Sequence, residues 1–217
     1  MLEVIGDALP FLMAGAVTTI NISIVAMGVG LILGLVAALC RMSRVRLVQW
    51  GAVGYIELIR GTPLLAQLFL LYYGLPQFGI RLEPFTAAVL GLGINYGAYL
   101  AEVYRAGILS IDRGQWEAGF SIGMSWWVLM YVIILPQAIR VILPPVGNYF
   151  ISMLKDSALT ATIAVSELLR QAQLRVAVTF RSFEIYALAA LIYFIMSYPL
   201  SLAVGALERR TTRGTRA

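Results

Sequence analysis

The residues of this sequence most suited to chemistry are ionisable side chains within or beside long apolar stretches. Arg60, Lys155 and Asp156 are placed in this way, as are Glu57 and Glu102. A charged group at bilayer depth costs at least about 2.5–3.5 kcal/mol, so such residues are functional suspects. A bound amino acid would supply complementary groups: a carboxylate for Arg60 or Lys155, and an ammonium for Asp156. The alternative is a structural network, for example between Arg60 and Asp156, that only ties two helices together.

Spacing gives these residues different expected partners. Glu57 and Arg60 are three residues apart, which suits an ion pair on one helical face. Glu102 is three residues from Arg105 and close to the end of its apolar stretch, so we expect a structural pair there. Lys155 and its neighbour Asp156 point in different directions on a helix and cannot fully satisfy each other. Each of those two therefore needs another partner.

Enzymatic chemistry is largely excluded by what the sequence lacks. It contains no His and one Cys, which rules out histidine bases, histidine metal sites and multi-thiolate metal sites. Gly119–Gly123 matches G-x-S-x-G, but a hydrolase needs a His to activate that serine. The one lysine, Lys155, follows Leu154 and not glycine, so no Walker A loop is present. We therefore expect no enzyme activity and no metal site, and any ATP must be hydrolysed by another chain.

Composition places most of the chain in lipid. Hydrophobic residues make up 60% of the 217 residues and charged residues only 12%, against about 25% charged in soluble domains. A helix needs roughly 20 apolar residues to cross a bilayer. Stretches of about that length or longer carry no charge at Ala8–Cys40, Gly61–Ile80, Pro84–Ala101 and Ile185–Leu207. The sequence therefore predicts an all-α polytopic membrane protein.

Two topologies compete, and arginine counting separates them. Five crossings at about 9–40, 48–78, 84–108, 137–160 and 184–207 leave 109–136 as a cytosolic loop between the third and fourth helices. This topology puts ten arginines inside and four outside, whereas a sixth crossing through 118–139 gives eight against six. Positive charge favours the cytosolic side. We expect one transmembrane domain over 1–217, with five spans, the N-terminus outside and the C-terminus in the cytosol.

Within that loop, the segment 117–136 carries a distinctive spacing. It reads EAGFSIGMSWWVLMYVIILP, with Glu-Ala-Gly at its start, a glycine six residues after the Glu, and Ile-x-Leu-Pro at its end. Gly123 and Ser125 should divide the loop into two short helices, and Pro136 should start the next helix. Elsewhere, Gly30-x-x-x-Gly34 and Gly93-x-x-x-Gly97 lie in predicted spans, where small residues let backbones approach closely. We expect these two motifs to pack within the chain.

These segments together resemble a known family. The 117–136 segment resembles the "EAA" loop by which permeases of ABC importers dock on their ATPases, with Gly119 where the third residue is usually Ala. Three other segments, 57–76 (ELIRGTPLLAQLFLLYYGLP), 96–117 (YGAYLAEVYRAGILSIDRGQWE) and 135–157, resemble permeases of the polar amino acid uptake family. That family includes importers of histidine, glutamine, arginine, cystine and opine-like solutes. The resemblance covers nearly the whole chain.

The resemblance implies partners as well as residue roles. It implies a subunit in the bacterial inner membrane that pairs with a second permease (a copy of itself or a homologue), two ATPases that bind ATP and Mg²⁺, and a soluble binding protein outside. This chain itself would bind no cofactor. By resemblance, the loop contacts the ATPase through Glu117, Ala118, Gly119 and Gly123, braced by Ile133, Leu135 and Pro136. The residues nominated for a solute pocket are Arg60, Gly61, Thr62, Pro63, Lys155, Asp156 and Ser157.

Tyr149 extends this pocket and bears on the solute class. It lies seven residues before Asp156, which is about two helical turns and nearly the same face. Some relatives that move cationic amino acids carry Glu at this point, whereas a tyrosine offers a ring and one hydroxyl. The hypothesis is a neutral or cyclic polar solute, although a cation–π contact keeps cationic solutes open, and plain packing is an equal alternative. A passive channel is the competing function, but a channel needs no ATPase-docking loop.

Overall fold

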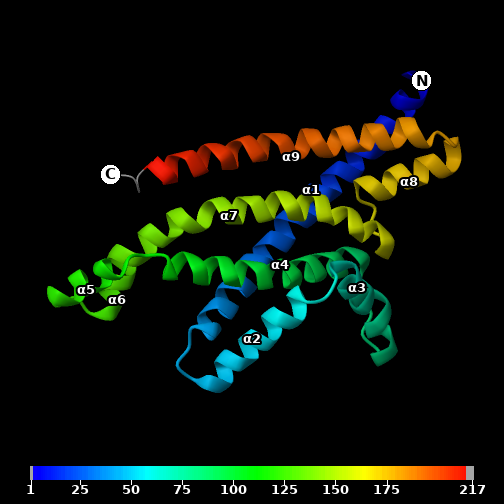
Figure 1. Ribbon diagram of the computed structural model, residues 1–217. Helices are drawn as coiled ribbons and strands as arrows, with labels where there is room; N and C mark the ends of the chain where they lie inside the picture. Colours follow the sequence, from blue (N-terminus) through cyan, green and yellow to red (C-terminus); the bar gives the residue numbers. More distant parts are fainter. Residues whose placement is uncertain (1, 214–217) are drawn as a thin grey trace.

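The structure is a computed structural model that describes residues 2–213, and every regular element in that range is a helix (Figure 1). The all-α prediction is confirmed. The elements are α1 (Leu2–Arg41), α2 (Arg46–Arg60), α3 (Leu64–Phe69), η1 (Leu70–Gly74), η2 (Leu75–Phe78), α4 (Pro84–Leu109), α5 (Arg113–Ser121), α6 (Trp126–Leu129), η3 (Met130–Ile134), α7 (Leu135–Asp156), η4 (Ser157–Ile163), α8 (Leu168–Thr179) and α9 (Ser182–Arg213).

Three helical stretches are long and apolar enough to cross a membrane: Gly6–Arg41, Trp126–Ile163 and Ser182–Arg209. A fourth candidate is the pair Arg46–Arg60 and Leu64–Phe78, which is bent by 103° at the break between them. The sequence predicted one span over 48–78. The turn at Gly61, Thr62 and Pro63 interrupts it, because the residue before a proline is disfavoured in the helical conformation.

The helix α4 forms the centre of the molecule and packs mainly against α1 and α7 (Figure 1). The two glycine motifs face each other at the α1–α4 crossing, which confirms that they pack within the chain. A Cβ on Gly34 would lie 2.8 Å from Leu100 Cβ and 3.0 Å from the carbonyl oxygen of Gly97. The close approach of the two backbones therefore depends on the absence of a side chain there.

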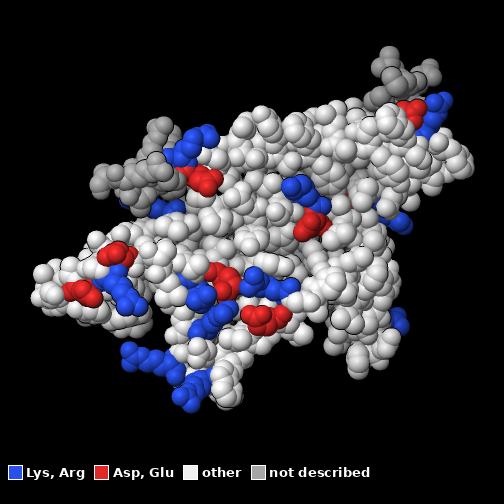
Figure 2. All heavy atoms as spheres, in the orientation of Figure 1, with Lys and Arg blue, Asp and Glu red and all other residues white. Residues whose placement is uncertain are grey.

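An ion-pair cluster joins α1 to α4 near the C-terminal end of α1. Glu102 accepts hydrogen bonds from Arg41 of α1 and from Arg105 one turn along α4, the latter at 3.1 Å. The structural role expected for Glu102 is thus confirmed, and Arg41 is a partner that the sequence did not suggest. Figure 2 shows a central group of charged side chains on an otherwise mostly uncharged face.

The segment after α7 is more ordered than the outer loop that the sequence suggested. It folds as η4 and α8, and α8 packs against the N-terminal part of α1 and against α9. The buried Glu167 caps α8 by accepting from the amides of Leu169 (2.9 Å) and Arg170 (2.7 Å), and it also accepts from Tyr193 Oη of α9 at 2.6 Å. One carboxylate therefore joins α8 to α9.

The predicted helix start at Pro136 agrees with the start of α7 at Leu135, but no irregular segment separates α7 from the second loop helix. Helical conformation begins at Trp126, ten residues before Pro136, and continues through α6 and η3 into α7. The π-helical segment η3 (Met130–Ile134) directly precedes the turn that contains Pro136, and such a widened turn tolerates the missing proline N–H. The irregular part of the loop therefore ends at Ser125.

Candidate functional site

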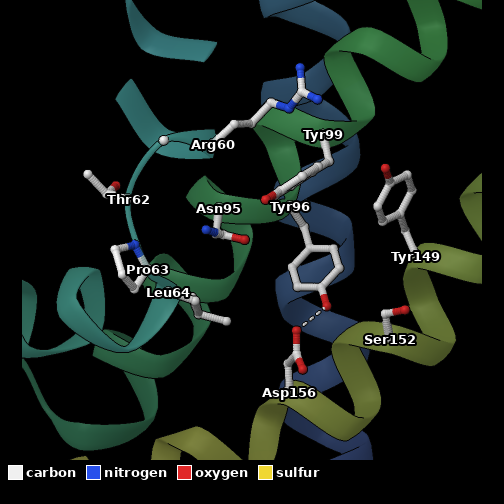
Figure 3. Close-up of a pocket in the computed structure, with 11 residues that line it drawn as sticks. Arg60, Thr62, Pro63, Leu64, Asn95, Tyr96, Tyr99, Tyr149, Ser152 and Asp156 are labelled. Carbon is white, nitrogen blue, oxygen red and sulfur yellow. Dashed lines mark hydrogen bonds between the residues drawn. The ribbon is translucent and has the colours of Figure 1, made fainter. Parts of the chain in front are cut away.

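The first cavity lies where the α2–α3 turn, α4 and α7 meet (Figure 3). Its volume is about 520 Å³, within the range of small-molecule sites. Its lining residues are Arg60, Gly61, Thr62, Pro63, Leu64, Asn95, Tyr96, Tyr99, Tyr149, Ser152 and Asp156. The structure thus brings together six of the eight nominated residues, which come from two segments almost ninety positions apart in the sequence.

The two charged residues of the cavity do not neutralise each other. Figure 3 shows Arg60 and Asp156 at opposite ends, with tyrosines between them. In the described part of the chain, no ion pair joins Arg60 to Asp156, and the expected pair between Glu57 and Arg60 is not formed either. The guanidinium carbon of Arg60 instead lies 5.3 Å from the ring centre of Tyr99. The alternative of a purely structural ion pair between Arg60 and Asp156 therefore does not agree with this geometry.

Asp156 is held by a tyrosine. Tyr96 Oη donates a hydrogen bond to Asp156 Oδ2 at 2.7 Å, as drawn in Figure 3. A carboxylate has about four lone-pair sites, so Asp156 retains capacity to accept from a ligand ammonium. The site can therefore offer a cation at one end and a carboxylate at the other.

A buried amide fixes the turn that carries Arg60. Gln67 Nε2 donates to the carbonyl oxygen of Ile59 at 2.8 Å and to Thr62 Oγ1 at 2.8 Å. Its Oε1 atom accepts from Asn95 Nδ2 of α4 at 3.0 Å. These bonds satisfy a carbonyl that the broken helix leaves free and tie the turn to α4.

Replacing Gln67 by Leu removes these bonds and leaves the Ile59 carbonyl and the Asn95 amide unpaired. We expect stability to fall by about 1–3 kcal/mol, which is the usual cost of unsatisfied buried groups. Thermal unfolding of the purified protein in detergent measures this effect. Gln77→Leu makes the same chemical change at an exposed position and should leave the midpoint nearly unchanged. Equal midpoints for the two variants would contradict this role of Gln67.

Two nominated residues lie elsewhere. Lys155 is exposed and does not line the cavity, and Ser157 is fully buried with its hydroxyl donating to the carbonyl oxygen of Leu154 at 2.7 Å. Thr62 lines the cavity, but its hydroxyl donates to the Leu58 carbonyl oxygen at 2.9 Å. Figure 3 shows its side chain turned away from the tyrosines.

Sequence reasoning missed five lining residues, four of them polar: Leu64, Asn95, Tyr96, Tyr99 and Ser152. Asn95, Tyr96 and Tyr99 cluster within two turns of the uncharged stretch Pro84–Ala101. Polar groups inside a membrane span tend to face a cavity or the interior of a bundle. That clustering was the feature of the sequence from which these three lining residues could have been predicted.

The loop forms a compact projection at one end of the molecule (Figure 1). Asp112 caps α5 through the amide of Gly114 at 2.7 Å, and Gly123 turns the chain with a φ of +82°. Ser125 then caps α6, so the predicted division at Gly123 and Ser125 is confirmed. Gly119 is buried against the side chain of Leu129, which packs the two short helices together.

The other nominated loop residues divide between surface and core. Glu117, Ala118 and Gly123 are exposed on the projection, and Pro136 is exposed on α7. Ile133 and Leu135 are half-buried and pack into the apolar cluster around Leu129 and Ile134. The nominated residues at the start of the loop, Gly119 excepted, are thus exposed, whereas Ile133 and Leu135 pack against the core beneath the loop.

Comparison with known proteins assigns the family. Residues 30–213 match the family of the binding-protein-dependent transport system inner membrane component. The chain belongs to this family. It is a multi-pass membrane permease subunit of an ABC importer, and its relatives are transport permeases and not ATPases.

Individual relatives of this permease family cover almost its whole length. The chain is 45% identical to the L-cystine transport system permease protein TcyB of Bacillus subtilis (strain 168), over 94% of this chain and 88% of that protein. It is 42% identical to the glutamine transport system permease protein GlnP of Escherichia coli (strain K12), over 95% of both. These matches confirm the resemblance drawn from the loop and the three other segments.

Solved structures agree. A crystal structure of an amino acid ABC transporter with histidines superposes with a TM-score of 0.91 at 45% identity, over 95% of this chain and 96% of that one. An inward-facing methionine ABC transporter, 16% identical, shares the fold with a TM-score of 0.76 over 93% of this chain and 96% of that one.

Proposed function

We propose that this permease carries an amino acid in its zwitterionic form, bound between Arg60 and Asp156. The observation that supports this most directly is the pair of opposite charges that face one cavity without pairing to each other. Arg60 is exposed and Asp156 is half-buried, and neither forms an ion pair within the described residues, so a ligand that carries both counter-charges can pair with both. The names of the relatives, which include cystine, glutamine and arginine permeases, support the same class.

The cavity also bears on the side chain of the solute. Asp156 is the one acidic residue among its lining residues, and the proposal assigns it to the α-ammonium. No second carboxylate remains for a cationic side chain, while Tyr149 and Tyr99 offer rings and hydroxyls. A neutral polar side chain is therefore the preferred solute, and selective transport of arginine would defeat this part of the proposal.

The test uses the purified importer complex and three related probes. Labelled L-glutamine has both α-charges, glutaramic acid lacks the ammonium, and 4-aminobutanamide lacks the carboxylate. We expect L-glutamine or L-cystine to compete for binding and the two single-charge compounds to compete at least about 30-fold more weakly, because each loses a charged contact worth about 2–5 kcal/mol. Equal competition by either single-charge compound would refute the zwitterion site.

We further propose five crossings, with the N-terminus outside and the C-terminus in the cytosol. We count the three long helices and the bent pair, which are apolar enough to cross, and add the 26-residue central α4 as the fifth span because of its length. Figure 1 supports an odd number, because the N-terminus and the end of α9 lie at opposite ends of the helix array. The loop lies at the same end of the molecule as the end of α9. Figure 2 shows basic side chains at that end and at the α1–α2 turn. Positive charge of this kind favours the cytosolic side.

The partners proposed are an ATPase on the loop, a second permease, and a soluble binding protein on the opposite side. ATP and Mg²⁺ would bind to the ATPase and not to this chain. The exposed apolar side chains of the loop support a docking role, with Ile122 77% exposed, Trp127 66% and Phe120 50%. Exposed apolar groups gathered in one place typically mark an interaction site.

Gly123→Val should weaken the association with the ATPase. A β-branched residue is strained at a φ of +82°, by about 1–2 kcal/mol or more, so the turn between α5 and α6 must change. Co-purification with a tagged ATPase subunit measures this association, and we expect most of it to be lost. Gly51→Val is the matched control, since no atom lies within 4 Å of its Cβ position and its φ is helical. Unchanged co-purification of Gly123→Val would argue against the turn as a docking element.

A further inference from the structure

A second cavity of about 370 Å³ adjoins the first. Its lining includes Glu102, Ser110 and Val141, and it shares Arg60, Tyr99 and Tyr149 with the first cavity. The shared residues mean that the two spaces meet at one wall.

The two cavities lie end to end along the interface of α4 and α7. On α4, the first is lined from Asn95 to Tyr99 and the second from Tyr99 to Ser110. On α7, the second is lined from Val141 to Tyr149 and the first from Tyr149 to Asp156. Since α4 leads into the loop and α7 leads away from it, the second cavity lies on the loop side of the first.

Together the cavities cover much of the thickness of a membrane. The fifteen-residue separation of Asn95 and Ser110 on α4 corresponds to about 22 Å at 1.5 Å per residue. The hydrocarbon core of a bilayer is about 30 Å thick. The two spaces thus follow one another over roughly three quarters of that thickness, interrupted where both share the same residues.

The interruption consists of two aromatic rings. The ring centres of Tyr99 and Tyr149 are 5.6 Å apart, a distance typical of aromatic rings in direct contact. Tyr96 packs on Tyr149 from the side of the first cavity at 6.1 Å, and Arg60 lies over Tyr99. Figure 3 shows Tyr99 on α4 and Tyr149 on α7 as neighbours, and their ring planes are tilted by 37°. Rings in contact leave no space for a solute between them.

We propose that the second cavity is the position that the solute occupies next on its way to the loop face. Tyr99 and Tyr149 form the closed partition between the two positions. Separation of the rings, by a shift of α4 against α7 or by a change of side-chain rotamer, opens the path. Arg60 lines both cavities and can keep the solute carboxylate within reach on either side. The interpretation of the two cavities as a solute path rests on the proposed function, but the experiment that tests the partition does not require transport.

The test is the labelling of introduced cysteines in the full importer complex, in a Cys40→Ser background. Inverted vesicles present the loop face to a charged methanethiosulfonate reagent. Ser110→Cys reports the second cavity and should react readily. Ser152→Cys reports the first cavity and should react at least about tenfold more slowly, because a closed constriction of this kind excludes water and ions.

Removing the rings should abolish this protection. In Tyr99→Ala/Tyr149→Ala, the reaction of Ser152→Cys should accelerate about tenfold or more, as expected for an opened constriction. Tyr149→Ala alone is the second variant if the double variant does not fold. Tyr149→Phe keeps the ring and should keep the protection. Tyr186→Ala makes the same truncation at an exposed position of α9 outside both cavities and should leave the rate unchanged.

Two results would overturn the partition: rapid labelling of Ser152→Cys from the loop face with both tyrosines present, or slow labelling that persists without their rings. Either outcome leaves the zwitterion site intact if L-glutamine or L-cystine still binds the wild-type complex. Loss of that binding with an unchanged labelling pattern would instead reject the solute class and keep the partition.

Discussion

Replacing Asp156 by asparagine should raise the dissociation constant of a zwitterionic amino acid by about 30-fold or more. The substitution keeps the size of the side chain and its bond to Tyr96 Oη, but it removes the negative charge that would face the ligand ammonium. Truncating one partner of a buried charge pair typically costs 2–5 kcal/mol, and each 1.4 kcal/mol is a factor of ten. Equilibrium binding of labelled L-glutamine and L-cystine to the purified complex measures the effect.

Two variants make this result specific. Glu57→Gln removes the same charge from an exposed position of α2 that does not line the cavity, and affinity should stay within about twofold, as for most exposed charges. Lys155→Gln decides whether the neighbouring lysine contributes. Because Lys155 is exposed outside the cavity, we expect a change no larger than for Glu57→Gln. Wild-type affinity in Asp156→Asn would remove this carboxylate from the pocket.

The second large effect is expected at the helix crossing. Gly34→Val should destabilise the protein by about 1–3 kcal/mol or more, since overpacking of a close-packed interface costs this much. The first added atom alone would lie 2.8 Å from Leu100 Cβ, and neither α1 nor α4 can retreat without losing its other contacts. The yield of monodisperse protein and its thermal midpoint in detergent should both fall.

Gly28→Val provides the matched comparison on the same helix. No atom lies within 4 Å of the Cβ position of Gly28, while the change in helix propensity is the same. Its midpoint should be close to that of the unmodified protein. Equal losses in both variants would mean that valine harms α1 by itself and that the crossing tolerates a side chain.

The sequence was sufficient for those features that depend on local spacing. The Gly34 and Gly97 motifs were predictable as a packing surface because only small residues permit such an approach. The division of the loop at Gly123 and Ser125 followed from a left-handed turn and a helix cap, both of which depend on a few adjacent residues. Charge depletion and long apolar stretches were sufficient for the all-α membrane fold.

Features that depend on distant partners were harder to predict. The pairing of Arg41 with Glu102 and the contact of Arg60 with Tyr99 join different helices, and nothing in the local sequence specifies them. Tyr96 and Tyr99 were missed because a tyrosine in an apolar span also suits lipid or core packing. The continuity of the helix from Trp126 into α7 was missed because a proline usually marks a boundary, whereas here helical conformation persists through the π-helical segment before Pro136.

The length of α1 has a mechanical consequence. Its 40 residues correspond to about 60 Å, roughly twice the thickness of the lipid interior, and Figure 1 shows it crossing the other helices obliquely. One end packs on α8, the other is pinned to Glu102, and the glycine contact with α4 lies between them. The glycine contact and Glu102 both belong to α4, so these two holds join α1 firmly to α4. A displacement on the α8 side of this permease would therefore reach α4, one of the two helices that line both cavities, along a single helix.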